Sequence, residues 1–189
     1  MEAIEIDKNQ KSVTLKNGKK ISYNFLVFAT GSIVNKIREV GDTEDSLYLR
    51  DIKDAISIKK ALNASNNIVI IGGGYIGLEI ASVASQMNIE VTIIEMENRI
   101  LSRVVCDDIS IFLQNKHEKE GVRFLLNKSV SQIKTNENKK YLTLDDQSII
   151  TTDNIIIGVG VKPNTYLAEQ LGLDCQNGIL VDEYGQTSI

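Results

Sequence analysis

Residues 72–77, with the sequence GGGYIG, are the part of the chain whose types and spacing point most directly to chemistry. Glycines at positions 72, 74 and 77 satisfy the GxGxxG pattern. In this pattern the first glycine permits a tight turn, the second lets a pyrophosphate approach the backbone, and the third lets a helix and a strand pack closely. A helix that begins here offers free N–H groups and a partial positive charge to phosphates. The segment therefore predicts a phosphate-binding loop.

Glu95 follows the loop at the end of a second apolar run. A carboxylate in this position can accept both ribose hydroxyls of an adenosine and repels a 2′-phosphate, so we expect NADH rather than NADPH. Arg99 and Arg103 lie downstream, where each could reach a phosphate or stay solvated. Glu79 lies in the first turn of the expected helix, where an acid is favourable for the helix itself. Its alternative role is a place beside the nicotinamide.

The elements around the loop alternate between strands and helices. Short β-branched runs at 68–71 and 91–94 are typical of strands buried on both faces. Between them, residues 76, 80, 83, 84 and 87 lie on one helical face, and an earlier helix capped by Asp51 carries a stripe at 52, 55, 56, 59 and 62. A helix over 107–120, closed by Gly121, and a strand at 154–157 follow. This order predicts an α/β fold with a Rossmann-like doubly wound parallel sheet.

Two β-meanders flank this core. Strands are expected at 12–15 and 21–28 around an Asn17-Gly18 turn, and again at 122–126, 130–134, 140–144 and 149–151. Residues 4–31 align without a gap on residues 133–160, and both copies end on a glycine. The interpretation is an internal repeat, against the alternative of two hairpins matched by chance. We also expect Asn164 to cap a short helix that ends before Gly172.

Bulk properties exclude several classes of protein. The formal net charge of −4 gives no electrostatic footprint for nucleic acid. No apolar run reaches the length of a membrane span, and the N-terminus lacks the pattern of a signal peptide. Cys106, Cys175 and His117 are too few and too dispersed for a metal site. His117 lies in a run of charges, which is typical of a solvated helix face. We expect a cytoplasmic protein without a metal.

Four ordered motifs resemble the pyridine nucleotide–disulfide oxidoreductase superfamily. They are YNFLVFATGS at 23–32, YLRDIKDA at 48–55, IIGGGYIGLE at 70–79, and GVGVKPN at 158–164 followed by GILVDEYGQTS at 178–188. Residues 101–122 look most like the NADH-dependent ferredoxin and rubredoxin reductases. The resemblance implies a partial FAD-binding domain at 1–38, a connecting segment and helix at 39–65, an NAD-binding domain at 66–160 and a return segment at 161–189.

The resemblance also implies the cofactors and their contacts. For NAD it implies the set Gly72, Gly74, Tyr75, Ile76, Gly77, Glu79, Glu95, Arg103, Gly158, Val159 and Gly160. For FAD, in a complete enzyme, it implies Ala29, Thr30, Gly31 and Arg50. Hydride would pass from NADH to FAD, and electrons would then pass to a redox protein such as a ferredoxin or rubredoxin.

The family's first glycine loop and its closing Gly-Asp motif have no counterpart here, so we expect a piece of a larger enzyme that is inactive alone. NADH oxidases, coenzyme A disulfide reductases and the flavin part of nitrite reductases are the close alternatives. A non-catalytic NADH-sensing module is the alternative of another class. A short-chain or medium-chain dehydrogenase is disfavoured, because neither a Tyr-xxx-Lys dyad nor zinc ligands occur at useful spacing.

Overall fold

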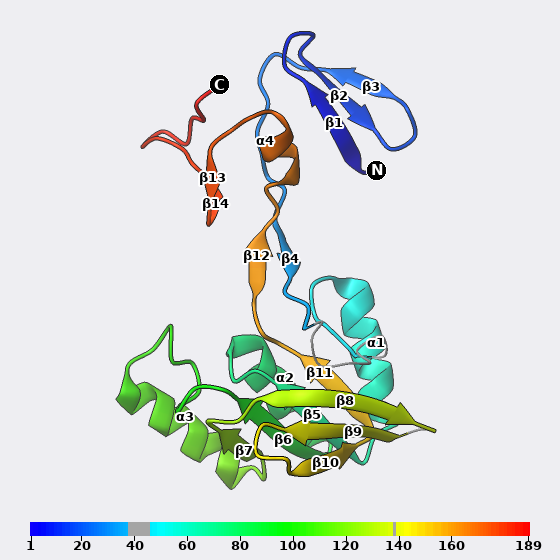
Figure 1. Ribbon diagram of the computed structural model, residues 1–189, viewed down its shortest axis with the longest axis vertical. Helices are drawn as coiled ribbons and strands as arrows, with labels where there is room; N and C mark the ends of the chain where they lie inside the picture. The colour runs from blue at the N-terminus through cyan, green and yellow to red at the C-terminus, as the bar shows by residue number, and fades with distance from the viewer. Residues whose placement is uncertain (38–45, 138) are drawn as a thin grey trace. The chain divides into compact units, whose positions relative to one another are not determined.

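A computed structural model describes residues 1–37, 46–137 and 139–189 of the chain (Figure 1). It divides into two units, the first made of Met1–Ile33 and Val161–Ile189 and the second of Val34–Gly160. The boundary expected between residues 38 and 39 lies outside the described residues. The helix expected in the connecting segment belongs to the second unit, together with the glycine loop.

The second unit is built on a four-stranded sheet with the order β11-β5-β6-β7. All three pairings are parallel. The strands are β5 (Asn67–Ile71), β6 (Glu90–Glu95), β7 (Arg123–Leu126) and β11 (Asn154–Ile157). Residues 68–71 of β5 are all buried, which confirms the expected strand covered on both faces.

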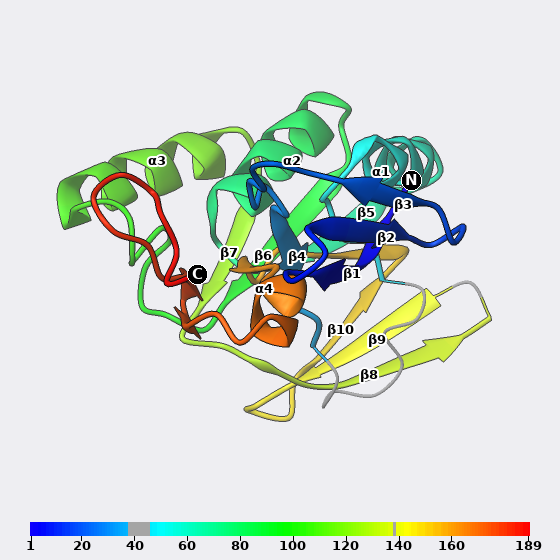
Figure 2. The ribbon, with the colours of Figure 1, turned by 90° about the horizontal axis from the view of Figure 1, so that it is seen from above.

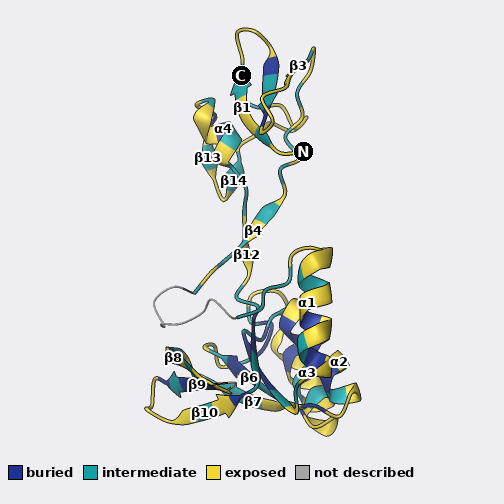
Figure 3. Ribbon diagram, turned by 90° about the vertical axis from the view of Figure 1, so that its right-hand side faces the viewer, coloured by how far each residue is buried: buried dark blue, intermediate teal, exposed yellow. Residues whose placement is uncertain are grey.

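Three helices cover one face of this sheet and a meander covers the other (Figure 2). The helices are α1 (Ile52–Asn63), α2 (Tyr75–Gln86) and α3 (Asp107–Lys119). The meander is β8 (Val130–Asn136), β9 (Lys139–Leu144) and β10 (Ile149–Thr152). Alternate residues of β5 point to opposite faces. Ile68 and Ile70 therefore join the core under the helices, and Val69 and Ile71 join the core under the meander. Figure 3 shows the buried residues of this unit on its central strands and on the sides of the helices that face them.

The predicted apolar faces of two helices were partly wrong. On α1, Ile52 and Ile56 are 74% and 62% exposed, and the buried residues are Ile58 and Leu62. On α2, residues 76, 83 and 87 of the predicted face are exposed, whereas Leu78 and Ala81, next to that face, are buried. Which side of a helix is buried depends on the angle at which the helix packs against the sheet. The spacing of apolar residues along the sequence does not specify this angle.

The first unit contains a small antiparallel sheet, β1 (Ala3–Asp7), β2 (Ser12–Leu15) and β3 (Lys20–Ser22), with α4 (Tyr166–Gln170). The short pairs β13 (Cys175–Gln176) and β14 (Gly178–Ile179), and β4 (Ser32–Val34) and β12 (Val161–Pro163), complete the strands described. The strand expected at 21–28 ends at Ser22, and Phe25 and Val27 beyond it are 93% and 83% exposed. Thr165, rather than Asn164, is the N-cap of α4.

The two meanders share one architecture, but the gapless alignment between them was wrong in the first strand. Val13 pairs with Ile21, and the aligned Leu142 pairs with Ile150, so the second and third strands match. Val13 also pairs with Ile6, however, whereas Leu142 pairs with Ile133. The equivalent of Ile133 is therefore Ile6 and not Ile4. The two copies differ in the length of their first turn, which a gapless comparison cannot represent.

Candidate dinucleotide-binding site

Two glycines of the loop between β5 and α2 are required by the fold itself. Gly72 has a φ of +108°, and a Cβ added there would lie 2.5 Å from the carbonyl oxygen of Gly158. A Cβ at Gly77 would lie 2.3 Å from the carbonyl oxygen of Gly72. Both distances are too short for any side chain, so these positions allow the turn and the close packing of α2 on the sheet.

Gly74 differs, because a Cβ there would fit without a clash. The nearest atom to a Cβ there is the Gly158 carbonyl oxygen at 4.0 Å. Gly74 is the N-cap of α2 and makes no side-chain cap, and Leu78 N–H makes the first helical bond, to the Gly74 carbonyl. The N–H groups of the helix's first turn thus have no intrahelical acceptor. By contrast, Asp51 and Asp54 form a complete capping box on α1. The start of α2 is therefore fit to hold an anion such as a pyrophosphate.

Glu95 lies beside the loop and is held there by backbone groups. Its Oε2 accepts the N–H of Gly73 at 2.6 Å, and its Oε1 accepts the N–H of Glu97 at 2.9 Å. An ionised carboxylate accepts about four hydrogen bonds, so each oxygen keeps a free lone pair. The carboxylate is thereby held in one orientation and can accept further hydrogen bonds. The contact with Gly73, the one glycine outside the GxGxxG pattern, was not anticipated from the sequence.

The segment between β6 and α3 closes over the same loop. Leu101 N–H donates to the Gly73 carbonyl oxygen at 3.0 Å. Arg99 donates to the carbonyl oxygens of Val105 and Ser102 and forms an ion pair with Asp107 at 3.0 Å. Of the two arginines considered, Arg99 is thus engaged within the protein, whereas Arg103 is exposed.

Gly158, Val159 and Gly160 follow the carboxyl end of β11. Gly158 N–H donates to the Ile71 carbonyl oxygen at 2.8 Å, which brings this turn against the glycine loop. The sheet order β11-β5-β6 places three predicted segments side by side, at the carboxyl ends of neighbouring strands: residues 158–160, 72–77 and Glu95. Open α/β sheets bind ligands at such ends, where the strand order reverses.

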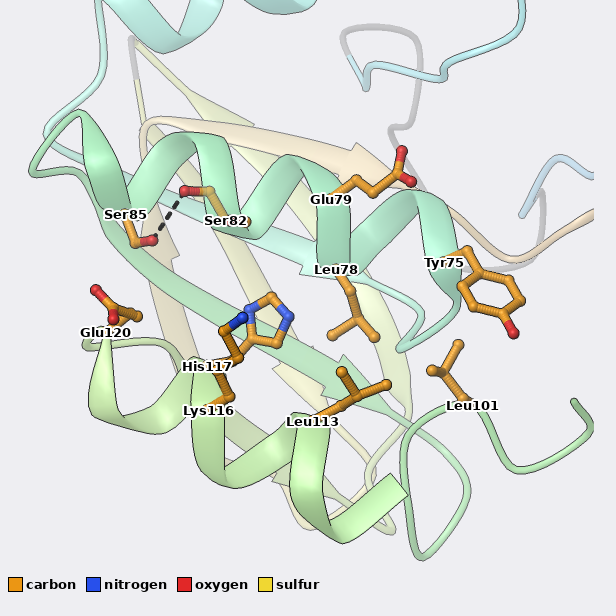
Figure 4. Close-up of a pocket in the computed structure, with 10 residues that line it drawn as sticks. All are labelled: Tyr75, Leu78, Glu79, Ser82, Ser85, Leu101, Leu113, Lys116, His117 and Glu120. Atoms are coloured by element: carbon orange, nitrogen blue, oxygen red, sulfur yellow. Dashed lines mark hydrogen bonds between the residues drawn. The ribbon is translucent and has the colours of Figure 1, made fainter. Parts of the chain in front are cut away.

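The remaining predicted residues lie on other segments of the chain. Glu79 is exposed on α2, and its side chain points away from α3 (Figure 4). Ala29, Thr30 and Gly31 belong to the first unit, whereas Arg50 belongs to the second. Thr30 Oγ1 donates to the Asn164 carbonyl oxygen at 2.6 Å.

A pocket of about 320 Å³ lies between α2 and α3 (Figure 4). Its lining is Tyr75, Leu78, Glu79, Ser82, Ser85, Leu101, Leu113, Lys116, His117 and Glu120. The expectation of a solvated His117 was partly wrong. The imidazole is partly buried and meets Phe124 edge-on, with ring centres 6.3 Å apart. Burial, and then the nearby Lys116 charge, lower the pKa of His117.

The whole chain, residues 1–189, matches the family model described as pyridine nucleotide-disulphide oxidoreductase. The chain belongs to this family. It is 35% identical over 190 residues to putidaredoxin reductase of Pseudomonas putida, covering 97% of this chain and 45% of that protein. It is also 35% identical over 187 residues to a rubredoxin-NAD(+) reductase of the same species, covering 98% of this chain and 49% of that protein.

The fold is shared with a solved family structure. The ferredoxin reductase for the CYP199A2 system from Rhodopseudomonas palustris superposes with a TM-score of 0.94 at 31% identity, over 98% of this chain and 46% of that one. The Rossmann-like α/β fold is confirmed. The chain spans about half the length of these relatives. Within residues 1–37, 46–137 and 139–189, no helix is long and apolar enough to cross a membrane.

Proposed function

We propose that this chain is the NADH-binding portion of an FAD-dependent oxidoreductase. In the complete enzyme, hydride passes from NADH to FAD and electrons pass on to a small redox protein. The observation that carries the proposal is the placement of Glu95, fixed by two backbone N–H groups beside an uncapped helix start. A carboxylate that can accept ribose hydroxyls, next to a helix N-terminus that can bind phosphates, is the arrangement expected for NADH.

Each segment of the site has a task in this proposal. When bound, NADH and FAD supply the hydride-transfer chemistry, and the protein binds and aligns them. The first turn of α2 holds the pyrophosphate, with Gly74 leaving room for its approach. Glu95 accepts the adenosine ribose hydroxyls, and we assign Arg103, which is exposed and lies downstream of Glu95, to a phosphate of the cofactor.

The flavin contacts belong to the complete enzyme. We assign Ala29, Thr30, Gly31 and Arg50 to FAD, and Glu79 to the nicotinamide end of NADH. We assign residues 66–160 to the NAD-binding domain and residues 1–38 to part of the FAD-binding domain. Residues 39–65 are the connecting segment and helix, and residues 161–189 are the return segment toward the FAD domain. We place the enzyme in the cytoplasm, in keeping with the free thiols of Cys106 and Cys175.

Cofactor titration of the purified chain tests the proposal. Wild type is expected to bind NADH more tightly than NADPH, because the Glu95 carboxylate repels a 2′-phosphate. Glu95→Gln keeps the shape and removes the charge, so the NADH preference should shrink about tenfold or more. Glu90→Gln, at the far end of the same strand, is the matched control and should change neither affinity. Tighter binding of NADPH by wild type would contradict the assignment.

The acceptor is tested on the complete protein. Names of the relatives, putidaredoxin reductase and rubredoxin-NAD(+) reductase, support a small redox protein as acceptor. NADH-driven reduction of a rubredoxin and of a [2Fe–2S] ferredoxin is therefore expected to be faster than oxygen consumption. Faster oxygen consumption in the presence of both acceptors would instead support an NADH oxidase.

A further inference from the structure

The turn at residues 158–160 occupies the far side of the site from Glu95. The sheet order β11-β5-β6 places Glu95 at the end of β6, the glycine loop at the end of β5 and this turn at the end of β11. A dinucleotide with its adenosine ribose at Glu95 and its pyrophosphate at the loop therefore extends its nicotinamide half toward residues 158–160. This step rests on the proposed function.

Asn35 lies against this turn through both its backbone and its side chain. Its backbone N–H donates to the Gly160 carbonyl oxygen at 3.0 Å. Its side-chain Nδ2 donates to the Val159 carbonyl oxygen at 3.3 Å. A Cβ added to Gly160, which has a φ of +94°, would lie 3.5 Å from the same Nδ2. Half-buried Asn35 thus engages two consecutive carbonyls of the turn.

The other end of the turn is fixed by different groups. Gly158 N–H donates to the Ile71 carbonyl, and Val159 packs against the core under the meander. Gly160 itself is exposed and has a φ of +94°. A glycine without further contacts can adopt many other backbone conformations, because it has no Cβ. At the Gly160 end, Asn35 therefore adds two hydrogen bonds to the restraint that the pairing of β12 with β4 provides from Val161 onward.

We propose that Asn35 is a positioning residue for the nicotinamide half of NADH. It acts through the backbone of Val159 and Gly160, whose peptide groups it holds in one orientation before the ligand arrives. A turn ordered in advance loses less conformational entropy on binding, and this favours affinity. Asn35 lies outside every glycine motif of the sequence, 124 positions from Val159.

The test compares two ligands on the purified chain. NADH and ADP-ribose share the adenosine, the pyrophosphate and the second ribose, but only NADH carries nicotinamide. Asn35→Ala is expected to weaken NADH about three- to tenfold, the effect of one lost hydrogen bond, and to leave the Kd of ADP-ribose within about twofold. A purely structural role would weaken both ligands together.

A second variant separates the hydrogen bond from the shape of the side chain. Asn35→Asp is isosteric, removes the donor and turns a carboxylate oxygen toward the Val159 carbonyl, so its NADH affinity should be lower than that of Asn35→Ala. Asn115→Ala, at an exposed position on α3, is the control and should match wild type for both ligands. Thermal unfolding of each variant shows that the chain is folded.

Several outcomes overturn the inference. They are an unchanged NADH affinity in Asn35→Ala, an equal loss for both ligands, failure of both variants to fold, and wild type binding NADH no more tightly than ADP-ribose. If wild type still binds ADP-ribose in these cases, the results do not contradict the proposed function. Wild type that binds neither ligand contradicts the proposed function, and this inference with it.

Discussion

At the scale of single residues, the three glycines of the GxGxxG pattern have different tasks. Gly72 and Gly77 face backbone atoms that a Cβ would meet at 2.5 and 2.3 Å, whereas a Cβ at Gly74 would fit without a clash. The fold therefore requires the first and third glycines, and only a ligand would require the second. Stability and binding should respond separately to substitution.

Gly77→Ala is expected to lower the free energy of unfolding by about 1–3 kcal/mol, the usual effect of overpacking. Gly74→Ala should leave the melting temperature within about 2 °C of wild type and weaken NADH binding about tenfold, because its methyl group occupies the approach of the pyrophosphate. Thermal unfolding and NADH titration of the two variants measure both effects. An equally large loss of stability in Gly74→Ala would contradict this division.

At the scale of elements, the meander is attached to the start of β5 through Asp153. Its Oδ2 accepts the N–H groups of Asn66 at 2.8 Å and Asn67 at 3.3 Å, and its Oδ1 pairs with Lys139. The Lys139 ammonium, followed by these backbone donors, holds the pKa of the Asp153 carboxyl below its usual value, against the opposing effect of burial. The connection between β10 and β11 is thus hydrogen-bonded to the connection between α1 and β5.

Asp153→Asn is expected to destabilise the chain by about 1–3 kcal/mol near pH 7, because it leaves backbone donors poorly paired. The folded pKa of Asp153 is lower than the unfolded one, so its contribution is present above about pH 4 and is lost as the pH falls through the folded pKa. The difference in the free energy of unfolding between wild type and Asp153→Asn should therefore disappear at low pH. Urea unfolding between pH 7 and pH 2 measures this difference.

Asp146→Asn is the control for Asp153→Asn. Asp146 pairs with Lys128 at 2.6 Å and accepts hydrogen bonds from Ser148, and these contacts lower the pKa of its carboxyl. Its side chain is 43% exposed, however, so solvent screening should keep the change in stability smaller than that of Asp153→Asn across the pH range. A loss as large as that of Asp153→Asn would show that the position of the acid in the fold does not matter.

The segment between β6 and α3 depends on Arg99, which binds two carbonyls and Asp107. Arg99→Ala should loosen residues 99–105, speed hydrogen exchange at the Leu101 amide and weaken NADH several-fold. Loss of these charge-assisted bonds frees the segment that covers the glycine loop. Hydrogen exchange followed by mass spectrometry measures this, and Arg103→Ala should leave exchange at Leu101 unchanged.

At the scale of the whole molecule, the predicted NAD-binding residues Gly72–Gly77, Glu95 and Gly158–Gly160 all belong to the second unit, which comprises Val34–Gly160. Saturating NADH should therefore slow hydrogen exchange in residues 72–77, 95–101 and 158–160, since a ligand stabilises the state that binds it. Exchange in β1, β2 and β3 of the first unit should not change. Protection confined to the first unit would place the site elsewhere.

Short stretches of the sequence were sufficient to predict the two central strands, the glycine loop and the position of Glu95 after the second strand. The runs at 68–71 and 91–94 are β-branched and apolar, so they form buried parallel strands, and glycine spacing and the position of Glu95 follow from the same short stretch. These features depend on neighbours within a few residues, which is why periodicity and spacing predict them.

Tertiary structure alone decided which surfaces and groups meet. It left Ile52 and Ile56 exposed and made Ile6, rather than Ile4, the equivalent of Ile133 in the other meander. It also paired Arg99 with Asp107 and brought Asn35 into hydrogen-bonding distance of Val159. Each of these outcomes depends on helix packing angles, turn lengths or contacts between distant parts of the chain. A glycine motif specifies where a phosphate can bind, but the residues that hold the surrounding backbone in place are selected only when the chain has folded.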